Sequence, residues 1–115
     1  MNSESSNQEE RIEAVLKEFE NKEVTPETIS AYTEYLETEL EIPGDVFCPV
    51  ENEYYILYEL EDSGDELYGT LAKLKLTSDE RQQAILPLCE IRGVENRSKN
   101  FQLIKDYSTW FVNYQ

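Results

Sequence analysis

The residues with the clearest capacity for chemistry are acidic side chains that crowd one predicted turn, Glu61-Asp62-Ser63-Gly64-Asp65-Glu66. Calcium prefers about six to eight oxygen ligands from carboxylates, carbonyls and water on a flexible backbone. Gly64 lets the turn bend so that Asp62 and Asp65 converge, while Ser63 and the turn carbonyls add neutral oxygens. The pattern therefore predicts a calcium site with the ligands Glu59, Glu61, Asp62, Asp65 and Glu66.

This turn also has a simpler interpretation, because Asp, Ser and Gly are common in solvated hairpin turns. It is not an EF-hand: counted from Glu59, Gly64 falls at the sixth place, but the twelfth place is Thr70 instead of a bidentate glutamate. Magnesium accepts carboxylates too, but its octahedral demand fits a loose loop less well. Asp45 is a further candidate oxygen, for which a turn-forming role is favoured, and Asp106 is expected to accept hydrogen bonds near Trp110 in a structural role.

The charge of the chain is segregated along the sequence. There are 25 acidic and 10 basic residues, and no basic residue lies between Lys22 and Lys73. That stretch holds 14 acidic residues: Glu23, Glu27, Glu34, Glu37, Glu39, Glu41, Asp45, Glu51, Glu53, Glu59, Glu61, Asp62, Asp65 and Glu66. An ordinary solvated surface mixes both signs, so this segregation suggests that an external cation or a basic protein surface neutralises it. Solubility alone is the simpler explanation of the acidity.

The composition argues against several functional classes. A formal net charge of -15 disfavours DNA, RNA and anionic membranes as partners. The chain has no histidine and two isolated cysteines, so neither histidine-based catalysis nor a structural zinc site is expected. Its 4 glycines do not form a phosphate-binding loop. With no signal-peptide pattern and no long apolar run, we expect a cytoplasmic protein. We expect it to be a monomer. Because no catalytic motif is present, we do not expect an enzyme.

The pattern of apolar residues predicts one domain over 1–115, with 1–7 loose. A helical part over 7–42 contains one amphipathic helix over 7–21 and a second that opens at Thr25-Pro26-Glu27 and stops at Pro43-Gly44. A β meander over 45–92 follows, and a short C-terminal helix over 100–112 brings Trp110 onto the core. The expected strands of the meander are 46–50, 54–60, 67–76 and 83–91.

These elements predict an α+β fold with two N-terminal helices, a small curled sheet or SH3-like barrel of four to five strands, and one C-terminal helix. The strands 54–60 and 67–76 are expected to pair. The acidic turn then lies at the tip of their hairpin.

The order of several short motifs resembles that of the small acidic calcium-binding proteins of bacteria, the CcbP type first recognised in cyanobacteria. The resembling pieces are Tyr32-Thr33-Glu34-Tyr35-Leu36-Glu37 with Leu40 and Pro43, the strand–acidic loop–strand of 54–76, Leu86-Pro87-Leu88, and Ile104-Lys105-Asp106-Tyr107 with Trp110. Together they span about residues 30–112. The resemblance implies an SH3-like barrel with flanking helices, and places the acidic loop at Glu59 through Glu66. It also implies cytoplasmic calcium binding as a buffer or signalling component, without enzyme activity.

Two functional hypotheses follow. The first is a calcium-binding protein that uses the acidic hairpin loop and the adjacent acidic surface. The second is an acidic protein-interaction module that binds a basic partner, or mimics nucleic acid, without a metal.

Overall fold

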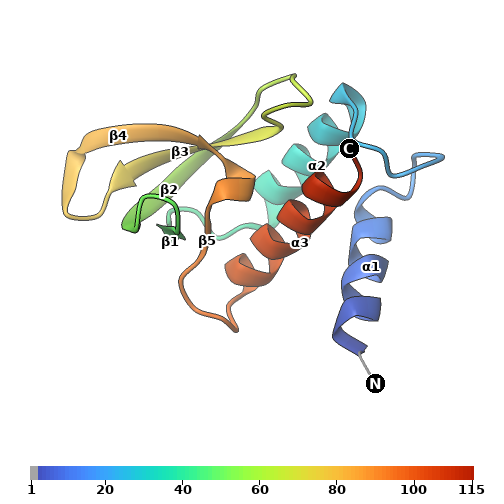
Figure 1. Ribbon diagram of the computed structural model, residues 1–115, viewed down its shortest axis with the longest axis horizontal. Helices are drawn as coiled ribbons and strands as arrows, with labels where there is room; N and C mark the ends of the chain where they lie inside the picture. Colours follow the sequence, from blue (N-terminus) through green and yellow to red (C-terminus); the bar gives the residue numbers. More distant parts are fainter. Residues whose placement is uncertain (1–2) are drawn as a thin grey trace.

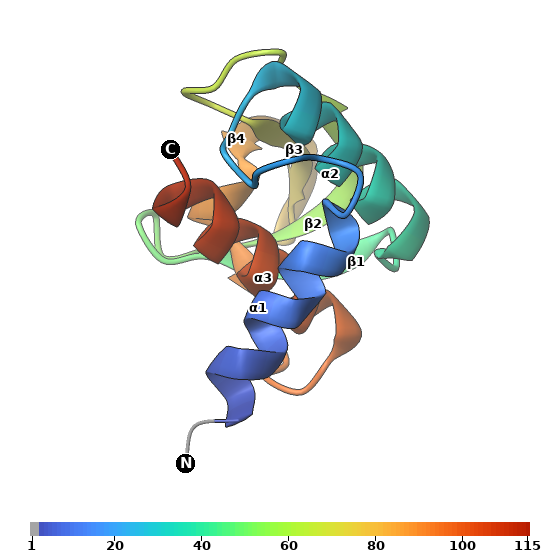
Figure 2. The same ribbon diagram turned by 90° about the vertical axis from the view of Figure 1, so that its right-hand side faces the viewer.

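The computed structural model describes residues 3–115, which form an α+β fold of three helices and one antiparallel sheet (Figure 1). In chain order the elements are α1 (Ser3–Val15), α2 (Pro26–Glu39), β1 (Gly44–Cys48), β2 (Glu53–Asp62), β3 (Thr70–Leu76), β4 (Asp79–Pro87), the 3₁₀ turn η1 (Leu88–Glu90), β5 (Arg92–Gly93) and α3 (Lys99–Asn113). Helices α2 and α3 pack near the sheet. Helix α1 crosses α3 on the side away from the sheet. In Figure 2 the sheet lies behind both helices. The predicted α+β class is confirmed.

The start of α2 follows from local chemistry, as predicted. Thr25 is the N-cap, and its side chain accepts a hydrogen bond from the Thr28 amide at 3.1 Å while the Thr28 hydroxyl accepts one from the Thr25 amide at 2.8 Å. This reciprocal pair satisfies two amides that a helix start leaves without partners. Pro26 at the first turn needs no amide partner, and its fixed φ already suits a helix.

The five strands form an open sheet in the order β4-β3-β2-β1-β5. Strands β1 to β4 therefore make the predicted meander, and β2 pairs with β3 as expected. The sheet does not close into a barrel, because β4 and the two-residue β5 remain as its edges. Strand β5 lies at the end of the predicted meander 45–92, was not among the expected strands, and pairs with Val46 and Phe47 of β1.

The ends of several elements differ from the predicted ones. Helix α1 begins at Ser3, inside the segment 1–7 for which the sequence predicts no regular element; residues 1 and 2 lie outside the described part. It ends at Val15 and not at the predicted residue 21, and 16–25 form turns and extended chain. The C-terminal helix is the longest of the three, with 15 residues. The predicted strand 67–76 starts at Thr70, because the preceding Gly69 adopts a left-handed conformation with φ 62°.

The hydrophobic core lies between the sheet and the helices. Leu57 and Leu74 on the inner sheet face are fully buried. From the helices come Tyr32 of α2 and Trp110 of α3, whose rings stack with centroids 4.9 Å apart. The Trp110 indole also donates a 2.7 Å hydrogen bond to the Lys22 carbonyl, so the predicted return of the tryptophan to the core is confirmed. No helix within residues 3–115 has the length and apolar character needed to cross a membrane.

Candidate cation-binding surface

The acidic turn lies, as predicted, at the tip of the β2–β3 hairpin and is built from its own polar groups. Asp62 accepts a hydrogen bond from the Gly64 amide at 2.9 Å, and Asp65 accepts one from the Leu67 amide at 2.7 Å. The Ser63 hydroxyl accepts a third from the Asp65 amide at 3.0 Å. Asp and Ser side chains commonly replace backbone partners in turns in this way. The three side chains therefore shape the loop, which explains their presence without any ligand.

Two of the five predicted calcium ligands already form an ion pair with a lysine side chain. Glu59 and Glu61 lie on β2, and both pair with Lys73 of β3, at 3.1 and 3.2 Å. Glu59 stands directly opposite Lys73 in the strand register, so the pair belongs to the sheet surface and not to the loop tip. The hydrogen bond to Glu59, with that to Glu61, raises the pKa of Lys73. Of the predicted set, only Asp62, Asp65 and Glu66 therefore lack an ion pair within residues 3–115.

The fit of these residues to calcium is good in chemistry and poor in arrangement. Carboxylate, hydroxyl and carbonyl oxygens are the ligands that calcium prefers. Among residues 7–115, whose side chains the structure describes, however, no three acidic or cysteine side chains are gathered closely enough to hold a metal ion. The loop as folded is not a calcium cage, so its carboxylates would have to move together to make one.

The remaining acidic side chains are dispersed over the surface. All members of the 14-residue set except Glu39 are exposed. Glu39 pairs with Lys99 at 3.4 Å, and apart from Glu59 and Glu61 no other member has an ion pair with a described residue. The cation-free stretch of sequence thus remains largely without cations after folding, because the later lysines and arginines reach few of its carboxylates.

Three acidic residues do line one hollow, at the junction between α2 and β1. Glu41, Asp45 and Glu95 line a cavity of about 250 Å³ together with Pro43 and Val94. No lysine or arginine lines it. The sequence analysis named Asp45 as a candidate but missed Glu95, which is brought there from the loop after β5. That placement depends on the β1–β5 pairing, for which the local sequence carries no signal.

Asn100, in the first turn of α3, also lines this hollow. Its side chain accepts a hydrogen bond from the Glu41 amide and donates one to the Glu41 carbonyl, both at 2.8 Å. A Cβ atom on Gly44 would come within 2.7 Å of both Asn100 Nδ2 and the Glu41 carbonyl oxygen. The backbone that carries Glu41 is therefore fixed, whereas the Glu41 side chain is exposed.

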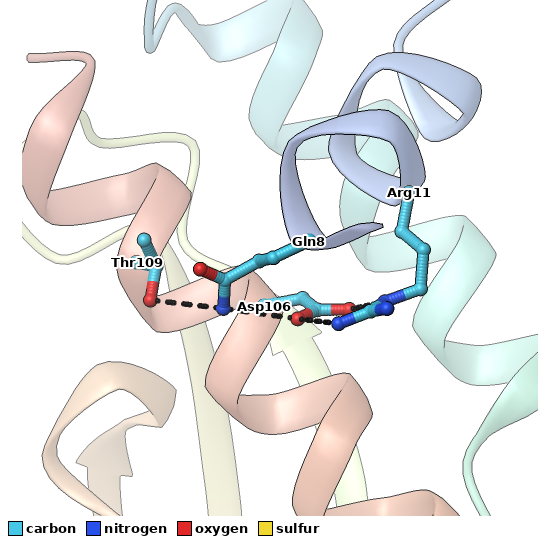
Figure 3. A network of polar contacts seen from close by, with 4 residues as sticks. All are labelled: Gln8, Arg11, Asp106 and Thr109. Atoms are coloured by element: carbon cyan, nitrogen blue, oxygen red, sulfur yellow. Dashed lines mark hydrogen bonds and ion pairs between the residues drawn. The ribbon is translucent and has the colours of Figure 1, made fainter. Parts of the chain in front are cut away.

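Asp106 has the structural role that the sequence favoured. Its carboxylate is buried between α3 and α1, where it accepts hydrogen bonds from Arg11 Nε at 2.6 Å and Arg11 Nη2 at 3.0 Å (Figure 3). Gln8 donates a further bond to Asp106 at 3.0 Å and one to Thr109 at 3.3 Å. This network fastens α1 to α3 and leaves no carboxylate oxygen of Asp106 without a donor.

Comparisons of the chain with known protein families, with curated proteins and with solved structures found no match.

Proposed function

We propose that this protein is an acidic binding module that recognises a basic segment of a partner protein. The observation that carries this proposal is the hollow at the α2–β1 junction, which is lined by Glu41, Asp45 and Glu95 and by no lysine or arginine. Of the 14 acidic residues between Lys22 and Lys73, all but Glu39 are exposed, and only Glu39, Glu59 and Glu61 have an ion pair with a described residue. Such a surface suits a cationic partner that makes many contacts better than it suits a chelated ion.

The hollow has the chemistry to receive one lysine or arginine side chain. The alkyl stem of such a residue packs against apolar groups while its charged end stays near water or a carboxylate. Pro43 and Val94 provide the apolar contact, and the three carboxylates provide the counter-charge. The net charge of -15 would speed the encounter with a basic partner, and this effect weakens as salt is added.

The test uses a fluorescent peptide rich in lysine and arginine and measures its anisotropy on titration with the protein. The variant E41Q/D45N/E95Q removes three charges from the hollow. The variant D62N/D65N/E66Q removes three charges from the hairpin tip and is the matched control. We expect the first variant to weaken binding by about tenfold more than the second.

Equal weakening by both variants would show that the peptide responds to net charge alone, and the proposal for the hollow would fail. Thermal unfolding of both variants checks that the fold is intact.

Calcium binding at the hairpin tip is the second candidate function. It is favoured by Asp62, Asp65 and Glu66, which are exposed and have no ion pair among residues 3–115. Because these groups must first be drawn together, we expect a dissociation constant of roughly micromolar to millimolar. Titration calorimetry with calcium at low salt tests this, and D62N/D65N should abolish the heat. Unchanged heat in that variant would place any calcium site elsewhere.

The resemblance to the CcbP type supports this second candidate and brings further expectations with it. They are a cytoplasmic role as a calcium buffer or signalling component, and an SH3-like arrangement of the strands. The four-strand meander β1–β4 is the part of the open sheet on which an SH3-like relation would rest.

A further inference from the structure

A second hollow adjoins the one at the α2–β1 junction and has the opposite chemistry. It is lined by Phe47, Tyr54, Arg92, Gly93, Val94 and Asn96. Its volume is about 290 Å³, and no acidic residue of the described chain lines it, although the protein has 25 acidic residues. We call it the Arg92 hollow. Val94 lines both hollows, so the two are neighbours on the surface.

Strand register explains why the aromatic and cationic side chains of the Arg92 hollow lie together. Phe47 of β1 stands opposite Tyr54 of β2 on one side and opposite Arg92 of β5 on the other. Directly opposite residues of neighbouring strands point to the same face of a sheet. The Phe47 and Tyr54 rings have centroids 4.8 Å apart, and the Arg92 guanidinium carbon lies 5.3 Å from the centre of the Phe47 ring. The three side chains therefore form one row across three strands.

The polar groups of this hollow are hydrogen-bond donors that the fold leaves available. Arg92 is exposed, and its side chain has no ion pair or hydrogen bond with a described residue. Its contact with Phe47 is an attraction between the positive charge and the ring face, which leaves the N–H groups unused. A guanidinium presents N–H donors in a planar fork, and a carboxylate accepts two of them in parallel. The Tyr54 hydroxyl and the Asn96 amide can add donors from the lining. The Arg92 hollow thus suits one carboxylate.

The separation of the two hollows matches the repeat of an extended chain. Asp45 lines the hollow at the α2–β1 junction and Phe47 lines the Arg92 hollow, and both lie on β1, two residues apart. Residues two apart in a strand share one face and lie about 6.5 to 7 Å from each other. A lysine and a glutamate two residues apart in an extended partner segment have the same spacing.

We propose that the Arg92 hollow binds a carboxylate side chain of the partner segment whose lysine or arginine occupies the hollow at the α2–β1 junction. The inference rests on the proposed function and specifies the partner as an extended segment with a basic and an acidic residue two positions apart. A segment that is basic throughout would bring a cation against Arg92. A highly charged anion would be repelled by the net charge of -15, whereas one carboxylate within a basic segment is not.

The test measures the fluorescence anisotropy of three labelled peptides of identical composition, each with several lysines and one glutamate among serines. In two peptides the glutamate lies two residues before or two residues after the central lysine. In the third it lies at the end of a long serine tail. We expect the better of the first two to bind about fivefold more tightly than the third, as one well-placed ion pair allows.

The variant R92Q should remove this preference. Its matched control is R97Q, which removes the same charge from an exposed residue that lines neither hollow and should keep the preference. R92K retains the charge but loses the planar fork, so we expect it to keep only part of the preference. Replacing the peptide glutamate by glutamine should weaken binding to the wild type but not to R92Q.

The outcomes separate this inference from the proposed function. Equal binding of the three peptides by the wild type, or a preference that R92Q retains or that R97Q also loses, would overturn the carboxylate site at Arg92. The acidic module would still stand if E41Q/D45N/E95Q weakens a lysine- and arginine-rich peptide more than D62N/D65N/E66Q does. Thermal unfolding of R92Q, R92K and R97Q checks that the fold is retained.

Discussion

At the scale of single residues, the contact between Arg11 and Asp106 is asymmetric. The side chain of Asp106 is 5% exposed, whereas that of Arg11 is 38% exposed. Water can therefore solvate Arg11 when its partner is removed, but cannot do the same for Asp106. A buried charge that has lost its counter-charge is the costly case.

We therefore predict that R11A destabilises the protein more than D106N does. The first leaves a buried carboxylate without its guanidinium, at a cost of about 3 kcal/mol. The second keeps an oxygen acceptor of the same shape and should cost about 1 kcal/mol. Urea unfolding followed by tryptophan fluorescence measures both, and the opposite order would contradict the assignment of the buried charge.

Two tyrosines respond to pH through a carboxylate acceptor. Tyr55 donates a hydrogen bond to Glu51, and Tyr114 donates one to Glu9. Each bond stabilises the neutral phenol beside a negative charge and raises the pKa of that tyrosine to about 12. The pKa is raised in the folded state, so the stabilisation is complete below the ordinary value of 10.0 and is lost as pH rises through about 12.

We expect the urea midpoint of the protein to fall between about pH 10 and pH 12. Y114F removes one of the two phenols and should lower the midpoint at neutral pH while making the alkaline decline shallower. An equally steep decline in Y114F would mean that Tyr114 does not contribute to it. Phenolate absorbance of the wild type and the variant counts the groups that titrate.

At the scale of elements, the β2–β3 loop contains two glycines with different demands. Gly64 has φ 71°, and a Cβ atom there would meet nothing within 4 Å. Gly69 has φ 62°, and a Cβ atom there would overlap the Tyr107 hydroxyl and approach Phe111 Cε1 to 2.5 Å. Gly69 therefore fixes how closely the hairpin approaches α3, whereas Gly64 serves only the bend of the tip.

We predict that G64A costs about 1 kcal/mol, for the left-handed backbone alone. G69A should cost about 3 kcal/mol or more, because overpacking against α3 is added to the same backbone strain. Thermal unfolding of both variants gives the comparison. Similar costs for the two substitutions would contradict the close approach at Gly69.

The sequence predicted those elements whose signals are local. The start of α2 is encoded by Thr25 and Pro26, and the hairpin by alternating strands around an acidic turn, so both were predictable. The end of α1 was not, because apolar residues at helical spacing continue to Phe19 while the chain turns after Val15. Strand β5 is two residues long and exists only through its pairing with β1.

The same division applies to the candidate sites. The acidic hairpin tip is contiguous in sequence, so its position could be predicted. The ion pairs of Glu59 and Glu61 with Lys73 could not, because they depend on the strand register. The hollow at the α2–β1 junction joins residues from separate elements and could not be located before the fold was known.

At the scale of the whole molecule, self-repulsion sets the response to ions. A net charge of -15 on 115 residues destabilises the compact state, and added salt screens that repulsion. We predict that sodium chloride raises the melting temperature by a few degrees. If calcium at matched ionic strength raises it further, and magnesium does not, a specific calcium site is present. Equal shifts for all three salts would leave screening as the whole effect.

The open edge of the sheet makes the charge a defence against aggregation. Strand β4 is an edge strand, so part of its backbone can pair with another copy, and mutual repulsion between acidic molecules opposes that approach. The repulsion disappears near the isoelectric point, about pH 4.2. We therefore expect light scattering to rise as the pH falls toward that value, and Q82E, which adds a negative charge to the exposed part of β4 and lowers the isoelectric point, to delay the rise. The acidity that would attract a basic partner thus also opposes the growth of fibres by pairing at the open edge of the sheet.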